Sequence, residues 1–174
     1  MSEPTRMEYE RRWLLPASAV DELTLHPSRR AIDDRYLDCG RLRVRRIVES
    51  ATGRTAFKLT KKWETSVARA IPIKTILLSA AEHDALRALP GRDLAKVRCT
   101  FDRGADVFAV DVFSGALAGL VLASIEAESL AALDAIGPPP LALRETTEDA
   151  FFSGGALCRL DQAALLARLE AFLP

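Results

Sequence analysis

Acidic and basic residues alternate near the amino end of the chain. Glu8, Glu10 and Arg12 are spaced two residues apart. Because successive side chains of a β-strand point to opposite faces, these three would share one face of a strand. Carboxylate oxygens are the ligands that Mg²⁺ and Mn²⁺ prefer, and a guanidinium binds phosphate oxygens. The spacing therefore predicts a strand face that could hold a divalent metal beside a phosphate group.

Other strand-like segments carry a nearly pure basic face. The basic residues that share a face are Arg41, Arg43 and Arg45, then Lys58 and Lys62, then Lys96 and Arg98. A fifth segment presents carboxylates at Glu126 and Glu128. If the sheet curls into a closed barrel, this charged face becomes the interior. The cations would then need a multiply charged anion, such as a polyphosphate, or a hydrated lumen.

The alternative is a sheet with one face in water, which is the commoner meaning of such alternation in any single strand. Glutamates in particular are mostly exposed. The internal site is favoured because five segments repeat the pattern. Outside them, His26 and His83 are predicted to lie on the surface. The three cysteines, Cys39, Cys99 and Cys158, are predicted to be small core hydrophobes.

Three segments have helical patterns and would flank the sheet. Residues 79–89 open with Ser79 and Glu82 in a capping-box spacing, residues 127–136 end before a Gly-Pro run, and residues 161–173 open at Asp161. Leu78, Ala81, Ala85, Leu86 and Leu89 would form the buried side of the first. Since no repeat or long linker divides the chain, we expect one α+β domain over residues 1–174, with a mostly antiparallel sheet.

The composition limits the partners. Lys and Arg together number 24, as do Asp and Glu, so the formal net charge is zero and gives no general attraction to DNA or membranes. The cysteines form no CxxC or Cys/His cluster that would suggest zinc. With no signal-peptide pattern and no apolar run of spanning length, we expect a cytoplasmic protein without a membrane or DNA partner. Apolar positions on the last helix are compatible with a homodimer.

Taken in order, these segments resemble the CYTH family, also called the triphosphate tunnel metalloenzymes. Its E-x-E-x-K strand corresponds to Glu8-Tyr9-Glu10-Arg11-Arg12. Further segments that resemble it over about residues 7–157 are RYLDCGRLRVRR, KLTKK, LAKVRCTF, VDVFSGALAGLVLASIEAE and ETTEDAFFSGGAL. The resemblance implies a closed eight-stranded antiparallel β-barrel with flanking helices, whose interior is a polar tunnel.

The resemblance also implies an activity, the Mg²⁺- or Mn²⁺-dependent hydrolysis of inorganic triphosphate or of an organic triphosphate. The implied catalytic and metal-binding carboxylates are Glu8, Glu10 and Glu126. The implied phosphate-binding residues are Arg12, Arg43, Arg45, Lys58, Lys62, Arg69, Lys96 and Arg98. Two alternatives stay open: a module that binds polyphosphate or a nucleotide without efficient turnover, and a class IV adenylate cyclase.

The chain departs from the family pattern at several positions. Arg12 replaces the lysine of the first strand, and Ile71, Ile73 and Ser124 stand where glutamates are usual. Ser153 and Gly154 stand where many members have a basic residue and an asparagine. Glu128 cannot replace the glutamate missing at Ser124, because it lies four residues further along and is expected outside the barrel mouth. The resemblance therefore supports the fold more strongly than the activity.

Overall fold

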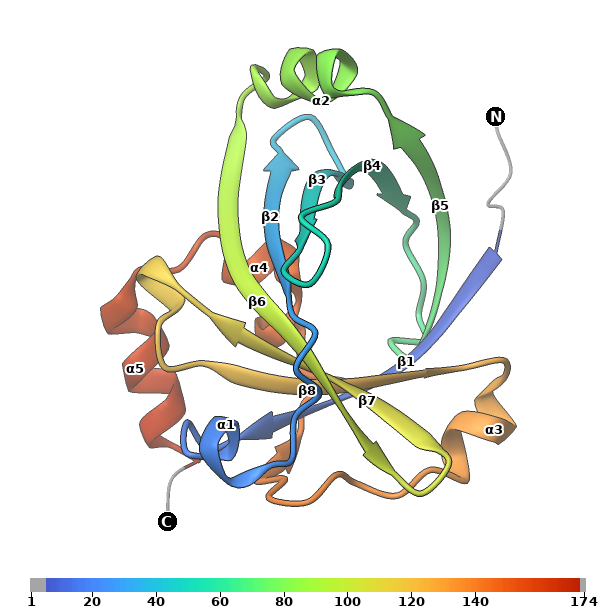
Figure 1. Ribbon diagram of the computed structural model, residues 1–174, viewed down its shortest axis with the longest axis vertical. Coiled ribbons are helices and arrows are strands. Elements are labelled where there is room, and N and C mark those ends of the chain that lie inside the picture. The colour runs from blue at the N-terminus through green and yellow to red at the C-terminus, as the bar shows by residue number, and fades with distance from the viewer. Residues whose placement is uncertain (1–5, 173–174) are drawn as a thin grey trace.

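The computed structural model describes residues 6–172 and shows a closed β-barrel (Figure 1). The predicted domain limits, and residue 173 of the predicted last helix, lie outside the described residues. The strands are β1 (Arg6–Leu15), β2 (Arg30–Leu37), β3 (Leu42–Glu49), β4 (Thr55–Lys62), β5 (Ala70–Leu78), β6 (Gly91–Arg103), β7 (Asp106–Phe113), β8 (Val121–Ala127) and β9 (Arg144–Glu145).

The first eight strands close on themselves. Their order is β5-β4-β3-β2-β6-β7-β8-β1, and β1 pairs again with β5. Every pairing is antiparallel, and short β9 adds to the outer side of the ring along β1. This confirms the predicted eight-stranded antiparallel barrel, and the closure gives one face of every strand a common interior.

Short helices flank the barrel. They are α1 (Ala19–Glu22), α2 (Ala80–Arg87), α3 (Leu130–Asp134), α4 (Gly154–Leu157) and α5 (Gln162–Glu170), with 3₁₀ turns η1 (Gly115–Leu117) and η2 (Ala150–Phe152). Figure 1 shows α2 across the top, between β5 and β6. The predicted capping box begins α2, since the Ser79 hydroxyl accepts the Glu82 N–H at 3.3 Å and the Glu82 carboxylate accepts the Ser79 N–H at 2.7 Å.

Some local predictions were wrong. The helix predicted over 127–136 is only α3, because β8 runs on to Ala127 and Ser129 caps the first turn. On α2 the buried residue is His83, which packs against the Phe57 ring at 4.6 Å between centroids, whereas Ala81, Ala85 and Leu89 are exposed. Cys39 is also exposed; Cys99 is buried as predicted, and Cys158 is half-buried.

Two apolar clusters fill the space between the barrel and its flanking segments. One joins Trp13, Phe101 and Phe108 to Ala19 of α1 and Leu133 of α3. It confirms that Trp13 points away from the charged row of β1. The second cluster, which we call the apolar floor, consists of Leu14, Leu94, Phe113, Leu117, Leu120, Leu122, Phe152, Leu157 and Leu165. Through this cluster, β6, β7 and β8 pack against the segments that follow β9.

Candidate functional site

A cavity of about 320 Å³ lies within the barrel. This volume is near the lower end of the range for small-molecule sites, about 300–1,000 Å³. The basic residues that line it are Arg12, Arg41, Arg43, Arg45, Lys62, Lys96, Arg98 and Arg159, and the acidic ones are Glu8, Glu10, Asp111 and Glu126. Among the charged lining residues the cations therefore outnumber the carboxylates by eight to four, which suits a compact polyanion.

Strand register brings these residues together from distant parts of the sequence. Residues directly opposite each other in an antiparallel pair have neighbouring side chains on the same face. Glu10 of β1 lies opposite Glu126 of β8, and Tyr36 of β2 lies opposite Arg43 of β3. The charged rows predicted from alternation lie on β1, β3, β4, β6 and β8. The rows of β3 and β4 are neighbours, as are those of β8 and β1, and closure of the barrel turns all of them to one inner wall.

Two buried aspartates neutralise part of the basic lining, and sequence reasoning did not identify either as a site residue. Arg45 donates from Nε and Nη2 to Asp34 at 2.6 and 2.7 Å. Arg98 donates from Nε and Nη2 to Asp111 at 2.7 and 2.8 Å. Asp34 and Asp111 therefore offset part of the repulsion among the cations of the inner wall. An available signal was Asp111 itself, a charged residue within the apolar run of β7.

The charge state of both aspartates follows from these pairs. Burial raises the pKa of Asp111, but the charges of Lys96 and Arg98 outweigh it and hold the pKa well below its usual range. Burial likewise raises the pKa of Asp34. The hydrogen bonds from Arg45 and the charge of Arg43 outweigh this effect, so the pKa of Asp34 lies below its ordinary value. Both carboxylates are therefore ionised at neutral pH.

Two arginines of the lining keep a donor free. Within residues 6–172, the Nε atoms of Arg12 and Arg43 are buried and have no hydrogen-bond partner. Arg12 donates from Nη1 to the Phe152 carbonyl at 3.0 Å, and Arg43 Nε lies 3.6 Å from Asp34. A buried donor without an acceptor is unfavourable, on the order of 1–3 kcal/mol. An oxyanion in the cavity would supply the missing acceptors.

The three predicted carboxylates form a separate acidic wall. Glu8 forms an ion pair with Lys62, Glu10 lies 3.6 Å from Arg12 Nε, and Glu126 lies 3.3 Å from Arg6. Burial and the charges of Glu8 and Glu10 raise the pKa of Glu126, so the three carboxylates lie within electrostatic reach of one another.

The acidic wall has the donor type that Mg²⁺ or Mn²⁺ requires. In the described part of the chain, however, no three His, Cys, Asp or Glu side chains are gathered closely enough to hold a metal ion. Each carboxylate of the wall turns to a basic neighbour instead. A cation would therefore draw these side chains out of existing ion pairs.

The departures from the family pattern have clear places. Ile71 lies opposite Glu8 and Ser124 opposite Arg12, and both line the cavity. Ile73 is buried and is not part of the lining. Glu128 follows the last residue of β8 and is exposed, as expected.

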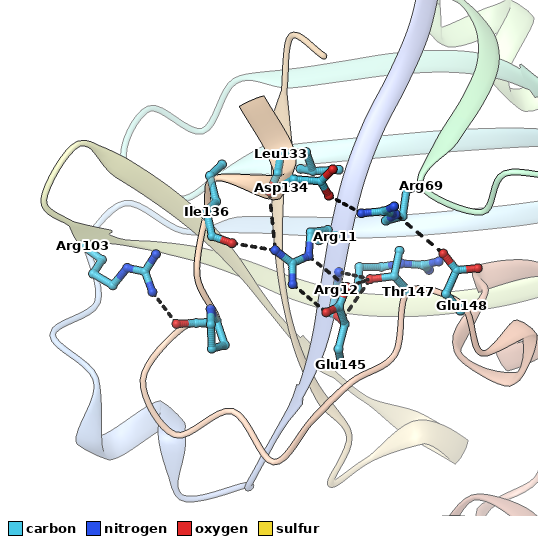
Figure 2. A network of polar contacts seen from close by, with 11 residues as sticks. Arg11, Arg12, Arg69, Arg103, Leu133, Asp134, Ile136, Glu145, Thr147 and Glu148 are labelled. Atoms are coloured by element: carbon cyan, nitrogen blue, oxygen red, sulfur yellow. Dashed lines mark hydrogen bonds and ion pairs between the residues drawn. The ribbon is translucent and has the colours of Figure 1, made fainter. Parts of the chain in front are cut away.

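Two predicted phosphate-binding residues do not line the cavity. Arg69 lies in the turn before β5, where strand alternation has not begun, and pairs with Asp134 and, at 3.7 Å, with Glu148. Figure 2 shows Arg69 with Asp134 and Glu148, beside the Arg11–Glu145 ion pair. Lys58 lies opposite Arg45 in the β3–β4 register. It precedes Lys62 by four residues, which places it about 13 Å from Lys62 along β4, and it is not among the residues that line the cavity.

Comparison with known proteins agrees with the fold. No family model and no curated protein matches the chain. One solved structure of the hypothetical protein NE1496 is 25% identical with a TM-score of 0.58, covering 88% of this chain and 99% of that one. Another, of the inorganic triphosphatase NE1496, is 23% identical with a TM-score of 0.56, covering 87% and 93%. The putative adenylyl cyclase HpAC1 from Hippeastrum is 10% identical with a TM-score of 0.50, covering 73% and 82%.

These likenesses and the closed barrel confirm the predicted architecture, and the chain has the fold of the CYTH triphosphate tunnel. Among the described residues, no helix is long and apolar enough to cross a membrane.

Proposed function

We propose that this chain is a metal-dependent triphosphatase that hydrolyses inorganic triphosphate or an organic triphosphate. The observation that carries the proposal is a pair of buried guanidinium nitrogens, Arg12 Nε and Arg43 Nε, which have no hydrogen-bond partner among residues 6–172. Both residues line a cavity in which cations outnumber carboxylates. The likeness to the inorganic triphosphatase NE1496, and to a Hippeastrum protein described as having a dominant triphosphatase activity, supports it.

The lining residues divide into two roles in this proposal. Arg12, Arg43 and Lys62 bind phosphate oxygens, while Arg45, Lys96 and Arg98, fixed by Asp34 and Asp111, provide preorganised positive charge. Such charge stabilises a phosphoryl-transfer transition state without a protein nucleophile.

The acidic wall would hold the metal once triphosphate is present. Glu8, Glu10 and Glu126 are the proposed ligands for Mg²⁺ or Mn²⁺, which when bound supplies charge neutralisation and a more acidic water. Release of Glu8 from Lys62, and of Glu10 from Arg12, frees both cations for phosphate. The acidic and basic parts of the lining thus exchange partners when the ligand enters.

Compartment and assembly stay predictions. The free cysteines Cys39, Cys99 and Cys158 favour a reducing compartment, so we propose that the protein is cytoplasmic. Leu166 of α5 is 46% exposed, which is compatible with the predicted homodimer.

Phosphate release tests the proposed function. Inorganic triphosphate, ATP and thiamine triphosphate are each supplied with Mg²⁺, with Mn²⁺ or with chelator. We expect metal-dependent phosphate release, fastest with inorganic triphosphate because the cavity is small. Binding without release would instead identify a non-catalytic polyphosphate-binding module, and formation of cyclic AMP from ATP would identify a cyclase.

Triphosphate is expected to raise the melting temperature of the protein more than sulfate does at equal ionic strength. A ligand that binds only the folded state stabilises it, and the stabilisation grows with affinity. Thermal unfolding followed by fluorescence would measure both shifts. Equal shifts from the two anions would argue against a specific polyphosphate site.

The affinity for triphosphate is expected to fall as pH rises above about 8. Burial, together with the charges of Arg98 and Arg45, lowers the pKa of Lys96 to about 8, although the charge of Asp111 raises it. Lys96 therefore loses its proton in this range, and one cation of the lining disappears. The folded-state pKa is below that of the unfolded chain, so stability of the ligand-free protein should rise over the same interval.

Lys96→Arg is the control for this pH dependence, because arginine stays charged. Calorimetric titrations of both proteins from about pH 7 to about pH 9.5 separate the Lys96 effect from ionisation of triphosphate itself. If the affinities of the two proteins change in parallel with pH, Lys96 does not titrate in this window.

A further inference from the structure

The strand that carries Glu10 and Arg12 has a gap in its pairing along one edge. On that edge β1 pairs with β5 as far as Tyr9 and with β9 from Trp13 onward, and residues 10–12 lie between these two partners. Backbone N–H and C=O groups need hydrogen-bond partners wherever they are shielded from water. The main-chain groups of the two site residues therefore need partners other than a neighbouring strand here.

Residues next to the ends of β5 and β9 fill this gap. The Glu10 N–H donates to the Arg69 carbonyl at 3.2 Å. The Arg12 N–H donates to the Thr147 hydroxyl oxygen at 2.9 Å, and the Arg12 carbonyl accepts the Thr146 N–H at 2.8 Å. Both main-chain groups of Arg12 are therefore held by the two residues that follow β9.

The Thr147 hydroxyl is itself oriented by a carboxylate. It lies 2.9 Å from Glu145 Oε1 but 3.4 Å from the Arg12 carbonyl oxygen. Since a hydroxyl has one proton and two lone pairs, donation to Glu145 leaves a lone pair for the Arg12 N–H. Arg11 fixes Glu145 in turn, donating from Nε and Nη2 at 2.9 and 2.6 Å (Figure 2). A continuous chain of contacts thus runs from Arg11 through Glu145 and Thr147 to the Arg12 main chain.

The Arg12 side chain enters the cavity from this fixed main chain. Its Nη1 atom donates to the Phe152 carbonyl at 3.0 Å, and its Nε atom is a buried donor with no partner among residues 6–172. Because a guanidinium is planar and its donors have a fixed geometry, the direction of the free N–H depends on where the two ends of the side chain are held. The main chain of Arg12 is one of those ends.

We infer that Thr147 is a positioning residue for Arg12, which fixes the Arg12 main chain so that the free Nε–H points at a phosphate oxygen. The inference rests on the proposed function and adds a residue that has no contact with substrate, since Thr147 does not line the cavity. Thr147 acts through one hydrogen bond to the Arg12 main chain, and Glu145 keeps the hydroxyl lone pair turned to that N–H.

Thr147→Val tests this role, because it removes the hydroxyl and nearly keeps the shape of the side chain. The Arg12 N–H then loses its acceptor, and the guanidinium loses its fixed direction. We expect triphosphate to bind about tenfold more weakly in the presence of chelator, as measured by calorimetric titration. Thr147→Ser retains the hydroxyl and should bind within about twofold of the unmodified protein.

The neighbouring threonine provides the matched control. Thr146 and Thr147 are 0% and 3% exposed, but the Thr146 hydroxyl oxygen has no hydrogen-bond partner among the described residues. Thr146→Val makes the same chemical change and should bind triphosphate as the unmodified protein does. Circular dichroism and thermal unfolding establish that each variant is folded. If Thr147→Val does not fold, Glu145→Gln carries the test, since it offers one acceptor oxygen to Arg11 and Thr147 in place of two and should weaken binding severalfold.

A double-mutant cycle separates positioning from a general loss of structure. Arg12→Ala removes the free Nε–H, so Thr147→Val should weaken binding no further when it is added to Arg12→Ala. A merely structural role would weaken binding by the same factor with and without the Arg12 side chain. Hydrogen exchange of the Arg12 amide, followed by NMR on the ligand-free proteins, should be faster in Thr147→Val than in Thr146→Val.

The outcomes distinguish the inference from the proposed function. Unchanged triphosphate binding in folded Thr147→Val, equal exchange of the Arg12 amide in the two valine variants, or an equal loss of affinity in the Arg12→Ala background would each overturn the positioning role. Failure of the unmodified protein to bind triphosphate would instead overturn the proposed function, and the exchange comparison would still show whether Thr147 holds the Arg12 main chain.

Discussion

Asp111→Asn is expected to destabilise the ligand-free protein and to increase the stabilisation given by triphosphate. Asp111 is 6% exposed and accepts hydrogen bonds from both Lys96 and Arg98. Loss of one partner from a buried ion pair costs about 3–5 kcal/mol, because the other charge is left uncompensated. For a chain of this size the melting temperature should fall by on the order of 10 °C.

Triphosphate should partly reverse this loss. Its oxygens can take the place of the missing carboxylate beside Lys96 and Arg98, so the ligand should raise the melting temperature of Asp111→Asn more than that of the unmodified protein. Thermal unfolding with and without triphosphate measures both effects. Asp93→Asn is the control, since this carboxylate pairs with Arg35 and Arg87 but is 53% exposed, and its loss should change little. Equal ligand shifts in Asp111→Asn and the unmodified protein would mean that triphosphate does not approach this pair.

The barrel could be predicted because alternation is a local property. In β1, Glu8, Glu10 and Arg12 lie on one face and Trp13 on the other, and this depends only on the period of the strand. Closure gives one face of each of the eight strands a common interior. The positions of Ile71 and Ser124 in the lining follow from the same rule.

Other features depend on contacts that alternation does not describe. The pairing of Asp34 with Arg45 requires the register between β2 and β3. Arg69, a phosphate-binding residue implied only by the family resemblance, has the parity of the interior row but lies before the first residue of β5 and pairs with Asp134 and Glu148. The contact of Tyr36 with Gly154 joins residues 118 positions apart through a segment outside the barrel.

The acidic wall contains the three carboxylates named from the sequence, but among the described residues they are not gathered closely enough to hold a metal ion. The sequence brings carboxylates to neighbouring strands, and the register places Glu10 opposite Glu126. The side chains of Glu8 and Glu10 nevertheless turn to Lys62 and Arg12, because isolated like charges repel and nearby cations are available. In the proposed function, a metal at this wall would compete with those ion pairs, and triphosphate would lower that cost by pairing with Lys62 and Arg12.

Glu10→Gln is expected to abolish the coupling between metal and triphosphate while the fold stays intact. In the unmodified protein, Mn²⁺ alone should bind weakly, since few carboxylates face it and they are paired. Triphosphate adds oxygen ligands and occupies the basic side chains, so each ligand should strengthen the other by the same factor, within the usual range of about 5–150-fold. Glutamine removes the charge at the centre of the acidic wall. The position lines the cavity and is not part of either apolar cluster, so stability should change little.

Calorimetric titration of triphosphate with Mn²⁺ and with chelator, on both proteins, measures this coupling. Glu148→Gln is the control, because Glu148 is 72% exposed and lies with Arg69 outside the cavity lining. It should keep the full effect of the metal. In Glu10→Gln, triphosphate should bind with the same affinity in Mn²⁺ and in chelator, and close to the affinity of the unmodified protein in chelator. If the unmodified protein itself binds triphosphate equally well in chelator, the acidic wall is not a metal site. A module that holds polyphosphate through Arg12 and Arg43 without turnover then becomes the better account of the cavity.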